Sequence, residues 1–144
     1  MIALVDGIQP QVLRLKDIIR YFIEHREVVV KRRTQFDLNR TLERAHILEG
    51  LKKALDQIDA VIRTIKSSKD KEDAHKNLIA KFKFSDKQAV AILEMKLQSL
   101  ANLERQKIED ELKEKQKFIK DLRVLLADPK KILRVVKEEV IEVK

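Results

Sequence analysis

The 144-residue chain has no cysteine and no tryptophan, and only two glycines, two prolines and one tyrosine. Without cysteine it holds neither a disulfide framework nor a cysteine-ligated zinc site. So few glycines and prolines supply too few turns for a β-sandwich or barrel. No apolar run approaches the ~18 residues of a membrane span, and the first residues lack the pattern of a signal peptide. We therefore expect a cytoplasmic protein without a membrane partner.

What the chain does have is typical of long helices. Hydrophobic residues make up 44% and charged residues 39% of it, with Leu, Ile, Lys, Glu, Arg and Ala abundant. The apolar fraction is too high for a disordered polyelectrolyte. The net charge of +8, from 32 basic and 24 acidic residues, favours an acidic partner, of which nucleic acid is the commonest.

Residues 11–66 contain no proline and carry two apolar stripes with helical spacing. The first stripe consists of Leu15, Ile18, Phe22, His25, Val29, Arg32 and Phe36. The second consists of Leu38, Leu42, Ala45, Leu48, Leu51, Leu55, Ile58, Ile62 and Ile65. One helix of ~45 residues would be ~65 Å long and must pack against another helix. We expect Gly50 to weaken it, and Asp59 to cap a new helix after a bend near residues 57–60.

The remainder of the chain predicts shorter helices and then a second long one. Residues 67–70 form a loop, and a helix is expected over 71–81. Ser85 and Gln88 match a capping box, which predicts a helix from Asp86. From Ile108 the apolar residues recur at steps of four and three, which is the spacing of a coiled-coil seam. Asp128 followed by Pro129 predicts the start of a last helix.

Both long seams are buried if the two long segments run antiparallel to each other. The predicted fold class is therefore all-α: a long antiparallel two-helix coiled coil that carries a small helical globular knob. The expected organisation is a short leading segment with a brief strand (1–10), an outgoing arm helix (11–57), a helical knob (58–103), a returning coiled-coil helix (104–127) and a terminal helix (128–144). We expect the chain to be a segment of a longer protein, because neither end looks cleanly capped.

Several blocks of sequence carry a family resemblance. They are residues 22–26 (FIEHR), 32–34 (RRT), 44–51 (RAHILEGL), 88–97 (QAVAILEMKL) and 125–133 (LLADPKKIL). In this order and spacing they resemble the A subunit of bacterial type IIA DNA topoisomerases, meaning DNA gyrase or topoisomerase IV. The resemblance covers nearly the whole chain and points to the end of the breakage-reunion region.

The resemblance implies a coiled-coil arm that ends in a dimerisation knob. Two knobs meet as a homodimer and form the exit gate (C-gate), through which a transported duplex leaves. The intact enzyme is an isomerase that supports supercoiling or decatenation of duplex DNA. It uses ATP and magnesium through a B-type ATPase subunit, and this segment itself would bind no cofactor.

The chain shows no catalytic residue of that enzyme. Its only tyrosine, Tyr21, follows an arginine as the family's nucleophile does, but it lies in an apolar stretch that matches no motif of the catalytic site, and we interpret it as a packing residue. Two scattered glycines cannot form a phosphate-binding loop. The three histidines suggest no converging metal site, so we expect no metal. We therefore expect the segment alone to be non-catalytic.

The stretch 88–103 is the candidate dimer interface, because its apolar residues lie on more than one helical face. A second apolar face indicates a partner, here a second copy about a twofold axis, although burial within the knob explains the pattern too. The candidate interface residues are Gln88, Ala89, Ile92, Leu93, Met95, Lys96, Leu97 and Leu100.

A basic run on the outgoing helix is the candidate DNA-facing surface. Its members are Arg26, Lys31, Arg32, Arg33, Arg40 and Arg44. Such a run attracts phosphates without reading sequence, or it is a solvated face with intrahelical ion pairs such as Glu27–Lys31. The alternative for the whole chain is a free-standing basic coiled-coil protein that binds nucleic acid or scaffolds partners.

Overall fold

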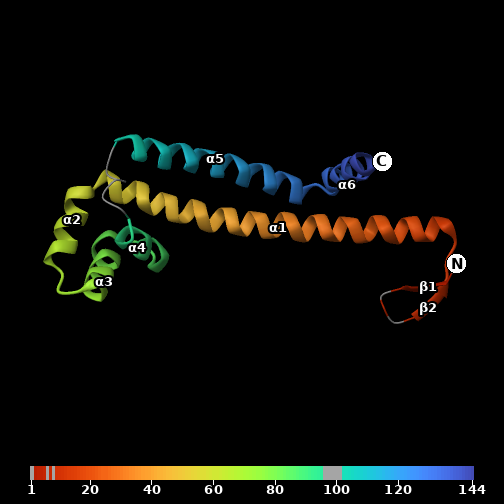
Figure 1. The fold of residues 1–144 in the computed structure, drawn as a ribbon, viewed down its shortest axis with the longest axis horizontal. Coiled ribbons are helices and arrows are strands. Elements are labelled where there is room, and N and C mark those ends of the chain that lie inside the picture. Colours follow the sequence, from red (N-terminus) through yellow and green to blue (C-terminus); the bar gives the residue numbers. More distant parts are fainter. Residues whose placement is uncertain (1, 6, 8, 96–101) are drawn as a thin grey trace. The chain divides into compact units, whose positions relative to one another are not determined.

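The computed structural model describes residues 2–5, 7, 9–95 and 102–144 and contains, in that part of the chain, six α-helices and one two-stranded sheet (Figure 1). The all-α class predicted from the sequence is confirmed. None of the helices in these residues combines the length and hydrophobicity of a membrane span. The chain divides into two compact units, residues 1–37 with 122–144, and residues 38–121. We call them unit 1 and unit 2.

Unit 1 begins with a hairpin that the sequence predicted only in part. The expected strand is β1 (Ile2–Val5), and it pairs antiparallel with an unpredicted strand, β2 (Gln9–Val12). Leu4 lies opposite Pro10 in this register. A proline is tolerated because a two-stranded sheet has only edge strands. Gly7, between the strands, has a φ of +72°, which glycine adopts without strain.

The core of unit 1 joins the first half of α1 (Leu15–Asp56) to α6 (Pro129–Val143). Val30 of α1 and Ile132 and Val136 of α6 are buried together. Asp128 caps α6 by accepting a hydrogen bond from the Lys130 amide at 2.9 Å, and Pro129 follows it, as the sequence predicted. The α6 helix thus presents its apolar face to Val30.

The first apolar stripe predicted for α1 is wrong. Leu15, Phe22 and Phe36 are 74%, 52% and 63% exposed, whereas Val30 and Thr34 are buried. Val30 and Thr34 lie about 110° and 150° around the helix from the centre of the predicted stripe. Thr34 is tolerated on the buried side because its hydroxyl donates to the Val30 carbonyl at 2.8 Å. The buried side of this part of α1 therefore lies away from the predicted stripe.

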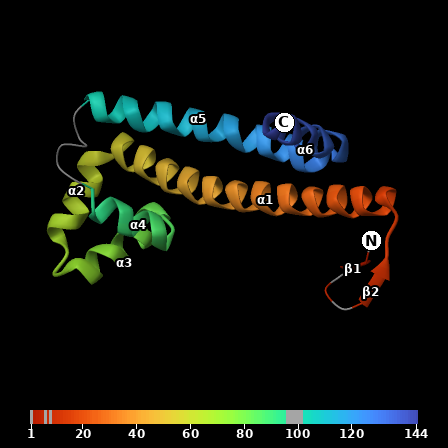
Figure 2. The ribbon, with the colours of Figure 1, turned by 45° about the vertical axis from the view of Figure 1, so that its right-hand side comes forward.

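Unit 2 gathers α2 (Ile58–Ser67), α3 (Lys71–Phe82) and α4 (Asp86–Leu93) around the end of α1 (Figure 2). These helices are short and amphipathic, and they meet in one core. The buried core residues are Ala54, Val61, Leu78, Phe84, Ala89 and Ile92. Much of the second predicted stripe is confirmed, since Leu38, Ala45, Leu48 and Leu55 are buried.

Within unit 2, ion pairs join α1 to α5 (Asn102–Ala127) in antiparallel order. Arg44 bonds to Glu111, Lys52 lies 3.7 Å from Glu109, and Arg105 bonds to Asp56. Residue numbers rise along α1 as they fall along α5, so the two helices run in opposite directions here. The supercoiled seam of a coiled coil stays a prediction.

The bend expected near residues 57–60 is confirmed, because α1 ends at Asp56 and α2 begins at Ile58, but the cap expected there is wrong. The helix continues through Gly50, which is buried, to Asp56. Asp59 does not cap α2; Gln57 occupies that position without a side-chain hydrogen bond, and Asp59 lies in the first turn. The break after Asp56 lets α2 turn Val61 into the core. The α4 helix ends at Leu93.

We predict that Lys83→Gly stabilises the fold by about 0.5–1 kcal/mol, because Lys83 ends α3 in the left-handed conformation with a φ of 56°, which costs a residue with a Cβ atom. Thermal unfolding measures the effect. Lys81→Gly, inside the regular part of the same helix, should destabilise by about 1 kcal/mol. The same sign for both variants would contradict this account.

Candidate functional site

The amino-terminal end of α4 is docked on α1 by a set of hydrogen bonds. Ser85 and Gln88 form the predicted capping box. The Gln88 side chain also donates from Nε2 to the His46 carbonyl at 2.8 Å, and the His46 ring lies 2.7 Å from the Ser85 hydroxyl. Lys87 adds an exposed ion pair to Glu43 at 2.9 Å. This contact fixes where α4 begins against α1.

Gly50 is what permits this contact. A Cβ atom at this position would lie 2.5–2.8 Å from the Cγ, Cδ and Cβ atoms of Gln88. Real atoms do not approach so closely, and the Cβ of Gln88 cannot move without moving α4. A glycine inside an otherwise regular helix is a sequence signal for such a close approach, in addition to the weakness that it gives the helix.

The candidate interface residues have different environments. Ala89 and Ile92 are buried in the core of unit 2, Leu93 packs partly against that core, and Gln88 holds α4 on α1. Met95 is half-buried, and Lys96, Leu97 and Leu100 lie outside the described residues. Val90, which the prediction omitted, is 38% exposed. Val90 and Leu93 form one side of a shallow hollow that Lys71, Glu72, His75 and Lys76 of α3 complete.

The six candidate DNA-facing residues do not form one free basic face. At ~100° per residue, Arg26, Arg33, Arg40 and Arg44 share a sector of about 40° on α1, and Lys31 and Arg32 lie well outside it. Three of the four are paired with carboxylates, as described next. Lys31, Arg32 and Arg40 are exposed and have no ion pair within the described part of the chain. The Glu27–Lys31 pair considered from the sequence is absent there too.

Two glutamates hold the paired arginines. In unit 1, Glu139 of α6 accepts from Arg26 and Arg33, each at 2.5 Å. In unit 2, Glu111 of α5 accepts a bidentate pair from Arg44 at 2.7 and 2.9 Å. The hydrogen bonds from Arg33 and then Arg26 lower the pKa of Glu139, and the hydrogen bond from Arg44 lowers the pKa of Glu111. These arginines serve packing between helices.

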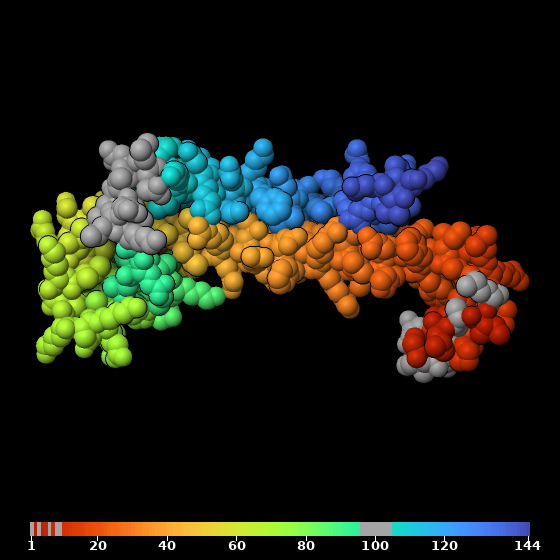
Figure 3. Space-filling model, viewed as in Figure 1, coloured from red at the N-terminus to blue at the C-terminus, as the bar shows by residue number. Residues whose placement is uncertain are grey.

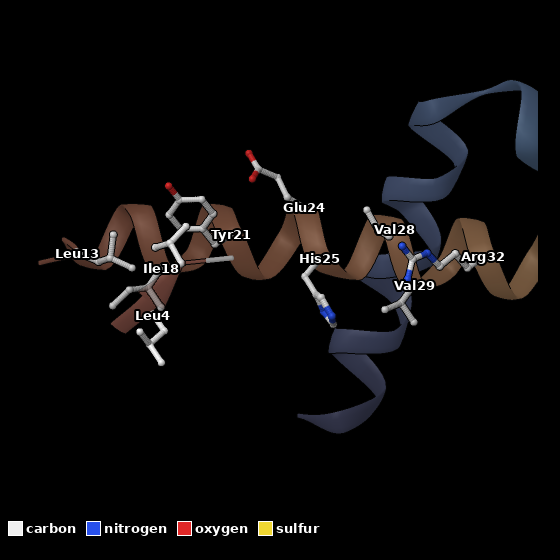
Figure 4. Close-up of a pocket in the computed structure, with 10 residues that line it drawn as sticks. Leu4, Leu13, Ile18, Tyr21, Glu24, His25, Val28, Val29 and Arg32 are labelled. Carbon is white, nitrogen blue, oxygen red and sulfur yellow. The ribbon is translucent and has the colours of Figure 1, made fainter. Parts of the chain in front are cut away.

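A separate hollow in unit 1 lies between the hairpin and the start of α1 (Figure 4). Leu4 of β1 and Ile18, Val28 and Val29 of α1 make it largely apolar. Tyr21 is half-buried in its lining, and the Arg20 guanidinium lies 5.3 Å from the tyrosine ring centroid. Tyr21 is thus in a packing environment.

The histidines take separate places. His25 lines the unit 1 hollow, His46 contacts Ser85, and His75 lies 3.1 Å from Asp86. Among the residues that the structure describes, no three His, Asp or Glu side chains converge as metal ligands. His25 and Arg32, which we expected inside the α1 seam, are exposed, and Lys115 of α5 is half-buried.

Comparison with known proteins decides the family. The family profile for the A subunit of DNA gyrase/topoisomerase IV matches residues 1–141. The chain belongs to this family. It is 52% identical over all 144 residues to the DNA gyrase A subunit of Clostridium acetobutylicum. It is 47% identical to that of Halalkalibacterium halodurans and 46% identical to that of Staphylococcus aureus. The chain spans 17%, 17% and 16% of the length of these three relatives.

Membership of the gyrase/topoisomerase IV A-subunit family gives the resembling blocks a physical meaning. The block at residues 44–51 contains His46 and Gly50, and the block at 88–97 contains Gln88, which contacts both. The block at 125–133 contains the Asp128 cap and Ile132 of the unit 1 core. These three blocks by which the chain resembles the family therefore contain residues that dock one helix on another.

We predict that Glu139→Gln lowers the free energy of unfolding at pH 7 by about 0.5–1 kcal/mol, because two arginines lose their carboxylate. Since the pKa of Glu139 in the folded chain lies below its ordinary 4.5, its contribution is complete above that value and is lost as the pH falls through the folded-state pKa. Thermal melts at a series of pH values from 7 downward should show the difference from wild type shrinking.

Glu138→Gln is the matched control, because its carboxylate is exposed and, among the described residues, pairs only with Arg134, four residues earlier on the same helix. It should change the melting temperature little at any pH. An equal loss of stability in both variants would show that the change in net charge is responsible, rather than the loss of the two hydrogen bonds from Arg26 and Arg33 to Glu139.

Proposed function

We propose that this chain is the exit-gate region of a type IIA topoisomerase A subunit, in which paired helices carry a knob that meets a second copy of itself. The observation that carries the proposal is the docking of α4 on α1 through Gln88 and Gly50, within sequence blocks that resemble the family. In the parent enzyme the knob contact opens to release a transported duplex and joins the subunits while the DNA is cleaved. ATP and magnesium act there through the B-type ATPase subunit.

The docked position of α4 supports a contact between two copies. Ala89 and Ile92 hold the helix in the core of unit 2 from one side. On its other side Val90 is exposed, and Leu93 lines the hollow with α3. Val90 and Leu93 form a small apolar patch on a side of α4 that also exposes Asp86, Lys87 and Glu94. Such a patch is suited to an isologous contact, because the same face serves both copies. Met95 adds an adaptable side chain beside it.

A chimera tests the proposed function directly. The segment of the Clostridium acetobutylicum gyrase A subunit that the chain matches is replaced by this chain. With the B subunit, ATP, magnesium and relaxed plasmid, we expect ATP-dependent supercoiling. A chimera that folds and dimerises but neither supercoils nor relaxes DNA would contradict the proposal.

We predict that Val90→Glu weakens self-association of the chain at least tenfold, because two carboxylates would meet across the twofold axis in place of apolar surface. Analytical ultracentrifugation over a range of concentrations measures the dissociation constant. Ile92→Glu is a poor test, because Ile92 is only 3% exposed and a charge there would disrupt the core.

Val124→Glu is the matched control, because it makes the same change at a valine of α5 that is 50% exposed. Circular dichroism confirms that both variants fold. A wild-type chain that stays monomeric at high concentration, or a Val90→Glu variant that associates as wild type does, would remove α4 from the interface.

A further inference from the structure

Seven exposed cations on and beside α2 and α3 have no ion-pair partner among the residues that the structure describes. They are Arg63, Lys66, Lys69, Lys71, Lys76, Lys81 and Lys83, and we call them the α2–α3 cationic set. The two helices pack on each other in unit 2, and they lie next to each other in the space-filling view (Figure 3).

The acidic residues of the same elements are engaged at helix amino termini. Asp70 caps α3 by accepting from the Asp73 amide at 2.7 Å, and Asp73 accepts from the Lys69 amide at 3.1 Å. Asp59 and Glu72 lie in the first turns of α2 and α3. The positive ends of the helix dipoles stabilise these carboxylates but leave them charged. Residues 58–83 therefore carry seven cations and four carboxylates, a net charge of +3.

The charged residues of α1 and α5 are used differently from those of α2 and α3. Between those helices the charges are used in pairs, as in Arg44–Glu111 and Lys52–Glu109. Such pairs set how one helix lies against another. On α2 and α3 the cations make no such pair among the described residues, so they do not contribute to packing and remain available to an anion outside the chain.

We propose that the α2–α3 cationic set binds the phosphate backbone of duplex DNA without reading its sequence. The proposal rests on the proposed function, since it names residues by which the same region handles DNA. At ~100° per residue Lys71, Lys76 and Lys81 lie on different sides of α3, so one duplex would contact only part of the set. Neither α2 nor α3 exposes an aromatic ring on which a single-stranded base would stack, and neither exposes a large apolar residue that would enter a lipid surface. Long lysine side chains without either feature fit the regular phosphates of a duplex.

The test is fluorescence anisotropy of a labelled duplex of about 30 base pairs with the whole chain at about 25–200 mM salt. Wild type should bind, and its affinity should fall steeply with salt. The triple variant Arg63→Ala, Lys66→Ala, Lys69→Ala, whose positions lie outside the hollow beside Val90, should bind at least tenfold more weakly at low salt. Its slope of log affinity against log salt should be shallower by about 2–3, since each phosphate contact contributes about 0.9.

Two triple variants are the controls. Lys113→Ala, Lys117→Ala, Lys120→Ala removes the same charge from the exposed side of α5. Lys31→Ala, Arg32→Ala, Arg40→Ala removes cations of α1 that have no ion pair within the described residues. Both should lose less than threefold in affinity. An equal loss in the α5 triple would show that only net charge matters, and a loss confined to the α1 triple would place the contact there; either result overturns the proposal.

Absence of binding by the wild type at low salt overturns the proposal as well. So does displacement of the duplex by polyglutamate at equal charge concentration, which would indicate an acidic protein partner. The proposed function is judged separately, by supercoiling in the chimera and by self-association. If the chimera supercoils DNA but the chain does not bind the duplex through α2 and α3, this inference alone is refuted.

Discussion

The contact between Gln88 and the backbone of α1 at His46 and Gly50 is the constraint on which unit 2 depends. The Gln88 side chain can lie at this distance from the His46 carbonyl because Gly50, which faces it, has no Cβ atom. Glycine costs the helix about 1 kcal/mol relative to alanine. The cost is offset because α4 can then bring Ala89 and Ile92 into the same core as Ala54 and Val61. With Ala89 and Ile92 in the core, the side of α4 that bears Val90 faces the solvent.

Charge has two different uses in this chain. Glu111 and Glu139 hold arginines of α1, so these cations fix how helices lie against each other. The cations of α2 and α3 have no such carboxylates among the described residues, because the acids nearby serve as caps and first-turn residues. A sequence count of basic residues cannot separate the two uses. The DNA-facing surface that we now favour therefore differs from the one that the sequence predicted.

Local sequence signals predicted the elements well where one residue decides the backbone. The Ser85–Gln88 box and the Asp128–Pro129 pair each placed the start of a helix correctly, because each depends on bonds within a few residues. The local signals failed where residues distant in the sequence determine where a helix ends or which of its faces is buried. Asp59 had the right chemistry for a cap, but the position of the break followed from burying Val61. The predicted first stripe of α1 failed similarly, since Val30 is buried by α6.

The sequence by itself determined the all-α class, the direction of the α1–α5 pairing in unit 2 and the family. Helical periodicity, caps and order of motifs are properties of the chain alone. Only the tertiary structure decided which cations are paired, why Gly50 is a glycine, and which residues of α4 face the core rather than the solvent. Those depend on atoms that are distant in sequence, and burial and Coulomb energy act through distance in space.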